Sequence, residues 1–176
     1  MARDPLKGRK HAIRGRELLR RYRYREAAEA LAAAVEADPQ RLADHLNLAV
    51  ALIGAGEPRQ AITALSAILE PLGIPEDLRA AAFRLRADAW ARTGDFESAE
   101  ADCRAALALR PADSDCLNAL AALRCKQGRL KEGLALFVAA ARAERQRTAG
   151  GAGSARSGAG EGGAAEGGAG STSSDP

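Results

Sequence analysis

The segment "GDFESAEADCRAALALRP", residues 94–111, contains the signals of one complete helix. Gly94 supplies the conformational freedom that a tight turn needs, and Asp95 stands where a side chain can cap the first helical turn. Pro111 ends the segment, because proline cannot continue the hydrogen-bonding pattern of a helix. Between these signals, small residues recur at i, i+4 and i+7, which places them on one face: Ala99, Cys103 and Ala106. The segment therefore predicts an α-helix with one buried stripe.

Weaker copies of this arrangement stand before and after it. The residues equivalent to Ala99 are Ala27, Ala61 and Gly133, at spacings of 34, 38 and 34 residues. A second helical face precedes each copy, so each repeat contains two helices. The preceding helices carry a small residue near their middle, which would let the partner helix approach closely: Gly15, Ala49, Ala87 and Ala121. A period in this range is typical of stacked helical repeats, in which three or more units bury a continuous core.

Glycines separate the two helices of the later repeats, at Gly56, Gly94 and Gly128. Glycine suits a tight turn because it adopts positive φ angles without a steric penalty. Tyr22 stands at the equivalent place in the first repeat, so the first turn departs from the pattern. Four extra residues before the third repeat fall in "PLGIPED", which predicts a loop because it holds two prolines.

This pattern resembles the tetratricopeptide repeat, which has a small residue within the first helix, a glycine turn, Ala-x3-large-x2-Ala on the second helix, and then proline. The resemblance covers residues 8 to about 144. It implies an all-α fold, a right-handed α-solenoid of about four helix pairs. The expected boundaries are a basic extension at 1–7, repeats at 8–41 and 42–75, a loop with a repeat at 76–113, and a repeat at 114–147.

Residues 148–176 have a different composition from the repeats. They hold 10 glycines among 29 residues and no Leu, Ile, Val or Phe. Such a segment buries too little apolar surface to offset the entropy lost on ordering. We expect a disordered tail rich in Gly, Ala and Ser.

The charge and cysteine content of the 176-residue chain limit its environment. The formal net charge is +3, and residues 1–25 carry ten Lys or Arg against Asp4 and Glu17. Three cysteines without a C-x-x-C pair favour a reduced, intracellular compartment, which we expect to be cytoplasmic rather than nuclear. No apolar signal segment follows the start, and the most apolar stretch, residues 48–56, is about half the length of a membrane span. We expect no membrane contact.

The residues that could carry chemistry do not form a recognisable site. His11 and His45 take equivalent places in two repeats, but no Cys, Asp or Glu joins them at the spacing of a metal site. Cys103 lies on a predicted buried stripe, and Cys116 and Cys125 have no nearby histidine to act as a base. We expect packing histidines, unreactive thiols, no metal, no cofactor and no catalytic activity.

The resemblance implies a concave groove lined by the first helix of each repeat, which holds a peptide of another protein. Transferred to this chain, the lining has several basic groups around an apolar centre, and this favours an acidic peptide with an apolar anchor. The 22 arginines against 4 lysines leave open that these charges reflect composition alone. The predicted lining is Arg9, Arg16, Arg20, Leu46, Val50, Ile53, Arg84, Asp88, Arg92, Asn118 and Lys126.

The last repeat has no closing helix in the predicted organisation. Leu134, Val138 and Ala141 would then form an exposed end surface, which either stays soluble through the charged segment "RAERQR" or contacts another protein. The leading hypothesis is a non-catalytic adaptor that binds a peptide in its groove. The alternative is an assembly protein that self-associates or docks through this end. Nucleic acid ranks third as a partner, on the basic and aromatic run at residues 20–25.

Overall fold

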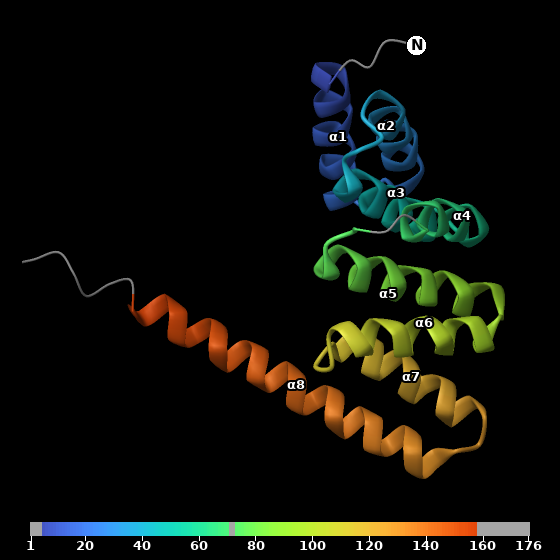
Figure 1. Cartoon of the computed structure of the whole chain (residues 1–176), viewed down its shortest axis with the longest axis vertical. Helices are drawn as coiled ribbons and strands as arrows, with labels where there is room; N and C mark the ends of the chain where they lie inside the picture. Colours follow the sequence, from blue (N-terminus) through green and yellow to red (C-terminus); the bar gives the residue numbers. More distant parts are fainter. Residues whose placement is uncertain (1–4, 71–72, 158–176) are drawn as a thin grey trace, which may run out of the picture. The chain divides into compact units, whose positions relative to one another are not determined.

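The computed structural model describes residues 5–70 and 73–157, and side chains are described for residues 6–70 and 73–149. The described residues form eight α-helices and no strand (Figure 1). The helices are α1 (Pro5–Arg20), α2 (Tyr24–Ala37), α3 (Leu42–Gly54), α4 (Pro58–Leu69), α5 (Glu76–Thr93), α6 (Phe96–Leu109), α7 (Ser114–Lys126) and α8 (Leu130–Ser157). This confirms the all-α prediction.

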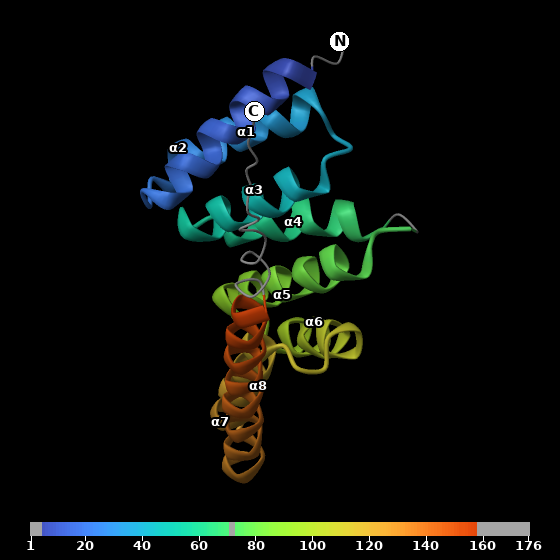
Figure 2. The same cartoon turned by 90° about the vertical axis from the view of Figure 1, so that its left-hand side faces the viewer.

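The helices from α1 to α7 pack in sequence, each against the next one along the chain (Figure 2). The first helices of successive repeats also contact one another, α1 with α3, α3 with α5 and α5 with α7. This second set of contacts follows from the period, because equivalent helices of stacked repeats lie in one layer. The helices are therefore packed pairwise as predicted, and α1, α3, α5 and α7 share one layer.

The turns inside the repeats have the backbone conformation that the glycines predicted. Gly56, Gly94 and Gly128 have φ angles of 83°, 87° and 77°. Tyr22 occupies the same place in the first turn with φ of 57°, and among the described residues it is the one non-glycine with positive φ. The turn thus forms in the first repeat too, with an exposed tyrosine in a conformation that costs about 1–2 kcal/mol for a residue with a Cβ.

Close helix approach explains two of the small residues in the repeats. A Cβ atom added to Gly15 would lie 2.5 Å from Cγ of Leu31, on the partner helix. A Cβ atom added to Gly133 would lie 2.4 Å from Sγ of Cys125. A larger residue at either place would have to push the two helices of its repeat apart.

Aspartates cap the first turn of two helices. The carboxylate of Asp95 accepts a hydrogen bond from the backbone N–H of Ser98 at 3.0 Å, which confirms the predicted cap of α6. Asp113 caps α7 in the same way, accepting from the N–H of Cys116 at 3.1 Å. The sequence reasoning missed this second cap, although Asp before a helix is the same signal.

The structure divides between Ala143 and Glu144 into two units, and α8 has residues in both. In the first unit, one apolar cluster joins α1 to α5, and two smaller clusters join α5 to α8. The second unit contains the end of α8, where Arg147 pairs with Glu144 and the Thr148 hydroxyl donates to the carbonyl of Arg145.

Two predicted boundaries differ from the structure. Helix α1 begins at Pro5, inside the segment predicted as a basic extension. Helix α8 continues to Ser157, ten residues into the segment predicted to be disordered. The rest of the predicted tail, residues 158–176, lies outside the described residues.

Candidate functional site

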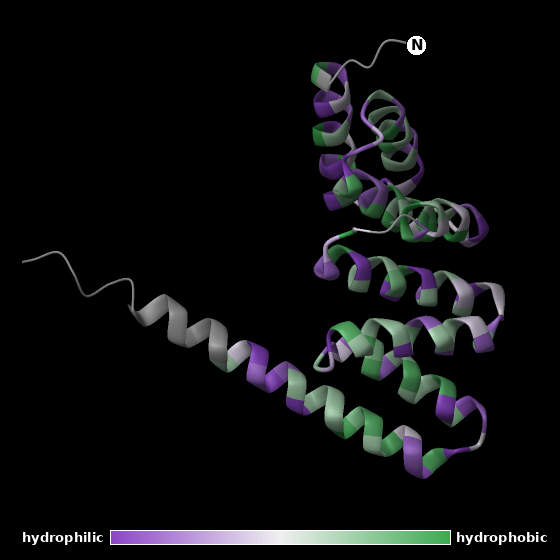
Figure 3. Ribbon diagram, in the orientation of Figure 1, coloured by the Kyte–Doolittle hydropathy of each residue, from purple (hydrophilic) through white to green (hydrophobic). Residues whose placement is uncertain are grey.

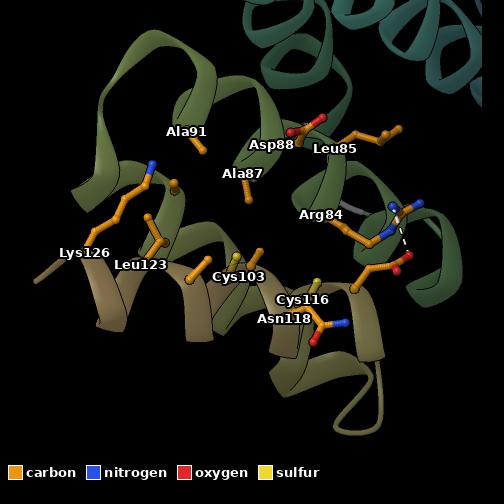
Figure 4. A pocket seen from close by; sticks show the side chains of 14 residues that line it. Arg84, Leu85, Ala87, Asp88, Ala91, Cys103, Cys116, Asn118, Leu123 and Lys126 are labelled. Atoms are coloured by element: carbon orange, nitrogen blue, oxygen red, sulfur yellow. Dashed lines mark ion pairs between the residues drawn. The ribbon is translucent and has the colours of Figure 1, made fainter. Parts of the chain in front are cut away.

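A trough lies between the first helices of the third and fourth repeats, α5 and α7, with α6 contributing to its lining (Figure 4). Its volume is about 370 Å³, and it is partly open to solvent. This volume is at the lower end of the range for ligand pockets in proteins. The trough can hold a small apolar group or a few side chains of a larger partner.

Small side chains on both walls make the space. Ala87 and Ala91 lie one helical turn apart on α5, and Ala119 and Ala122 lie about one turn apart on α7. Because these methyl groups are short, the two helices leave a gap between them where longer side chains would have filled it. Leu85 and Leu123 add larger apolar surface, so the lining is mostly apolar.

Charged groups stand at the two ends of the trough (Figure 4). At one end, Nη1 of Arg84 lies 3.4 Å from Oδ2 of Asp115, which joins α5 to α7. At the other end, Nζ of Lys126 lies 4.7 Å from the centre of the Phe96 ring. Asp88 on the rim pairs with a neighbour on its own helix. Lys126 is thus the lining cation with an aromatic rather than an anionic partner in the described residues.

Two buried thiols, Cys103 of α6 and Cys116 of α7, contribute to the lining beside the alanines. A hydrogen bond from the Cys116 thiol lowers the pKa of Cys103 from its ordinary value. The same hydrogen bond, together with burial and the nearby Asp113 carboxylate, raises the pKa of Cys116 far above the usual range. The pair therefore holds at least one proton at neutral pH and adds an apolar, weakly hydrogen-bonding surface.

One partly buried and one buried ion pair hold the helices around the trough. Arg86 of α5 donates two hydrogen bonds to Asp102 of α6, at 2.7 and 2.8 Å, and a third to the Ser66 hydroxyl of α4 at 2.9 Å. Arg124 of α7 donates two hydrogen bonds to Glu100 of α6, at 2.6 and 2.5 Å. These bidentate contacts fix the angles between neighbouring helices.

The second of these ion pairs shifts two pKa values. Hydrogen bonds from Arg124 lower the pKa of Glu100 below its ordinary value, and the same contacts raise the pKa of Arg124. Sequence reasoning missed both ion pairs, because the partners are 16 and 24 residues apart and lie on different helices, in the second case of different repeats. The sequence did contain one signal of the second ion pair. The charged residue Glu100 stands at the position where the preceding repeat has the apolar residue Ile62.

The trough brings together four of the predicted groove residues: Arg84, Asp88, Asn118 and Lys126. Arg92 is on the same helix as Arg84 but pairs with Asp88 and is absent from the lining. The other predicted groove residues lie on α1 and α3, outside the trough: Arg9, Arg16, Arg20, Leu46, Val50 and Ile53.

Among these residues, Ile53 needs a correction. It is 5% exposed and packs in the core, so its side chain cannot line a groove. Arg16 is also engaged, because its Nη1 lies 3.5 Å from Oδ1 of Asp44, a fully buried carboxylate that Arg41 approaches to 3.3 Å from the other side. The basic groups predicted to face a ligand are therefore largely paired within the chain.

The residues predicted for the end surface, Leu134, Val138 and Ala141, are all exposed on α8. The two histidines are half-buried, and Nε2 of His45 lies 3.0 Å from the carbonyl oxygen of Pro39. The described residues contain no cluster of three or more groups that could bind a metal ion. None of the helices described is both long and apolar enough to cross a bilayer.

The helix pairs, the turn glycines and the small residues at the crossings define an α-helical repeat protein. Two family models, both described as tetratricopeptide repeat, match residues 18–73 and 46–114, which together exceed half of the chain. The chain belongs to the tetratricopeptide repeat family. Domains of this family generally mediate protein–protein interactions, and neither match is to a catalytic domain.

Solved structures of similar fold include several of proteins named MamA. A crystal structure of MamA is 17% identical with a TM-score of 0.69, and the match covers 82% of each chain. A MamA structure from Desulfovibrio magneticus RS-1 is 16% identical with a TM-score of 0.68, covering 79% of this chain and 76% of the other. A structure titled MamA MSR-1 is 19% identical with a TM-score of 0.59, covering 76% and 74%. At these identities the likeness concerns the fold alone. No curated protein sequence matches the chain.

Proposed function

We propose that this protein is a non-catalytic adaptor and that the trough between α5 and α7 binds a peptide segment of another protein. The observation that carries the proposal is the cavity of about 370 Å³ between two first helices, lined mostly by apolar atoms and open to solvent. A concave apolar surface with a few polar groups at its edges is the usual form of a binding site.

The walls favour an apolar anchor on that peptide. Ala91 and Ala122 face the trough with side chains too short to fill it. A leucine, methionine or phenylalanine inserted between them would bury its side chain, and full burial of such a side chain is worth about 1.5–3 kcal/mol. One or two anchors of this kind give the modest affinity that is typical of peptide recognition by an adaptor.

The charges favour an acidic residue beside the anchor, at the Lys126 end. Arg84 already has an anionic partner, Asp115, so a peptide carboxylate there would have to compete with it. Lys126 contacts an aromatic face, and a carboxylate could join it without displacing another anion. The predicted apolar centre of Leu46, Val50 and Ile53 has no part in this proposal, because those residues lie outside the trough.

A peptide array tests the proposal with the full chain. The peptides vary the anchor (Ala, Leu or Phe) and the flanking charge (Glu, Ser or Lys). Ala122→Trp fills the trough from an exposed position, and Ala101→Trp, at an exposed position of α6 outside the trough, is the matched control. We expect the wild type and Ala101→Trp to bind anchored peptides with flanking Glu, and Ala122→Trp to lose this binding.

A charge variant separates the contribution of the apolar anchor to binding from the contribution of the flanking charge. Lys126→Glu should retain binding of anchored peptides with flanking Ser and lose the preference for flanking Glu. Binding that is equal in Ala122→Trp and the wild type would contradict the trough as the site. Binding that ignores the anchor and weakens only with salt would indicate a nonspecific attraction to the basic chain.

A further inference from the structure

Helix α8 has two apolar faces, and only one of them is covered in the described structure. Gly133, Ala140 and Ala143 lie on the covered face, which packs against α7. Leu130, Leu134, Phe137, Val138 and Ala141 follow one another at i, i+4, i+7, i+8 and i+11 on the other face, and all are exposed. These five residues are called the α8 stripe, and the apolar turns of α8 are visible in Figure 3. The stripe spans about 100°, the width of a packing face.

Two positions of the α8 stripe have buried equivalents in the earlier repeats. Phe137 is 41% exposed, whereas its equivalents in the first three repeats, Leu31, Leu65 and Cys103, are 0%, 0% and 1% exposed. Leu134 is 65% exposed, whereas its equivalent Ile62 is 8% exposed.

The difference lies in the helix that follows. The second helices α2, α4 and α6 each contact the first helix of the next repeat, namely α3, α5 and α7. The α8 stripe is thus a surface shaped to receive a first helix, and its natural complement is another α-helix.

The charges beside the stripe select among the helices that could fill it. Lys131 and Arg142 border it on the Val138 side, both exposed and without an ion pair among the described residues. A helix with acidic residues along its apolar stripe would meet these cations favourably.

The chain's own segments do not fit this description. The exposed apolar residues of α1, Leu6 and Ile13, stand among basic residues, including Lys10 and Arg14, so α1 of a second copy would be repelled. An antiparallel second α8 would bring Lys131 and Arg142 of both copies to the same edge. Residues 158–176 contain no Leu, Ile, Val, Phe or Met, so their sequence offers no apolar stripe.

We propose that the α8 stripe is a second binding surface, separate from the trough, which takes an amphipathic helix of another protein with acidic flanking residues. The partner helix occupies the place that a first helix occupies in the internal repeats. Its apolar side chains pack on Leu134 and Phe137, and its carboxylates approach Lys131 and Arg142.

Two designed helical peptides of about three heptads test the proposal by fluorescence anisotropy. Both carry leucine at the stripe positions; one has glutamate beside the stripe and the other lysine. We expect the full chain to bind the glutamate peptide about tenfold or more tightly than the lysine peptide. Leu134→Ser/Val138→Ser should abolish binding, and Leu6→Ser/Ile13→Ser, the matched change in exposed residues of α1, should not.

Charge reversal gives the decisive result. Lys131→Glu/Arg142→Glu should invert the preference, so that the lysine peptide binds more tightly, and circular dichroism checks that the helical content is unchanged. Equal binding of the two peptides, binding by neither, or a preference that survives the reversal would overturn the proposal. Sedimentation of the wild type that depends on concentration and is cured by Leu134→Ser/Val138→Ser would also overturn it, in favour of a second copy as the occupant.

Discussion

Replacing Arg124 with methionine tests how the last two repeats are held together. The guanidinium of Arg124 donates two hydrogen bonds to Glu100, at 2.6 and 2.5 Å, and a third to the side-chain carbonyl of Gln127 at 2.9 Å. Arg124 and Glu100 are 6% and 8% exposed. The variant therefore leaves a carboxylate almost out of contact with water and without its main partner.

The expected loss in the free energy of unfolding follows from this burial. Breaking a buried ion pair by removing one partner costs about 3–5 kcal/mol, because the remaining charge keeps its desolvation penalty. Arg104 also contacts Glu100, with Nη2 2.5 Å from Oε1, and it approaches from the exposed side. Since this second cation remains, we expect a loss near the lower end, about 3 kcal/mol.

The double variant Glu100→Ile/Arg124→Met separates the burial of charge from the loss of a contact. Ile62 occupies the equivalent position in the second repeat with the same 8% exposure, so the site accepts an aliphatic side chain. Exchanging both charges for apolar groups is often close to neutral, and we expect unfolding free energy within about 1 kcal/mol of the wild type.

Acid pH gives an independent check of the same ion pair. The pKa of Glu100 is lowered by its hydrogen bonds from Arg124, so its contribution to stability is present above the unfolded pKa of a glutamate, about 4.3. That contribution is lost as the pH falls through the lower, folded pKa. The double variant should therefore lose less stability than the wild type below about pH 4.3.

Urea unfolding followed by circular dichroism measures all three proteins, at neutral pH and in steps down to acid pH. A loss below about 1 kcal/mol in Arg124→Met would refute the reasoning, because it would mean that Glu100 is well solvated without Arg124. So would a double variant as unstable as the single one.

Three further changes have defined outcomes. Gly15→Val should lower the free energy of unfolding by about 1–3 kcal/mol, because its Cβ would meet Leu31, while the exposed neighbour Arg14→Val should change it little; urea unfolding distinguishes them. Gly94→Ala should cost about 1 kcal/mol in the same assay, because the turn requires a φ of 87°. Asp113→Ala removes the N-cap of α7 and should cost about 1 kcal/mol, with faster amide exchange in that helix's first turn.

The repeat period carried most of the fold prediction. Gly56, Gly94 and Gly128 marked the turns because positive φ angles favour glycine strongly, and Gly15 marked a helix crossing because a Cβ there has no room. Both are local steric constraints that favour glycine at one position, so they can be recognised from the sequence. Tyr22 shows the limit, since it adopts a φ of 57° at the equivalent turn although it is not a glycine.

The candidate site was harder to predict, because its character depends on contacts between repeats. The sequence analysis treated Arg84 as a cation available to a ligand, but Asp115 of the next repeat pairs with it. Ile53 was predicted to line the groove, but it packs in the apolar core and is 5% exposed. The space between α5 and α7 arises from alanines on both helices, which single helices do not reveal.

The trough as a peptide-binding site is tested most directly by NMR with alanine methyl groups labelled. Alanines line both walls, so the chemical shifts of their methyl groups show where a bound anchor lies. With the tightest-binding array peptide, we predict shifts concentrated at Ala87, Ala91, Ala119 and Ala122. Shifts concentrated instead at Ala135 and Ala141 of α8, or spread evenly over the alanines, would contradict the account.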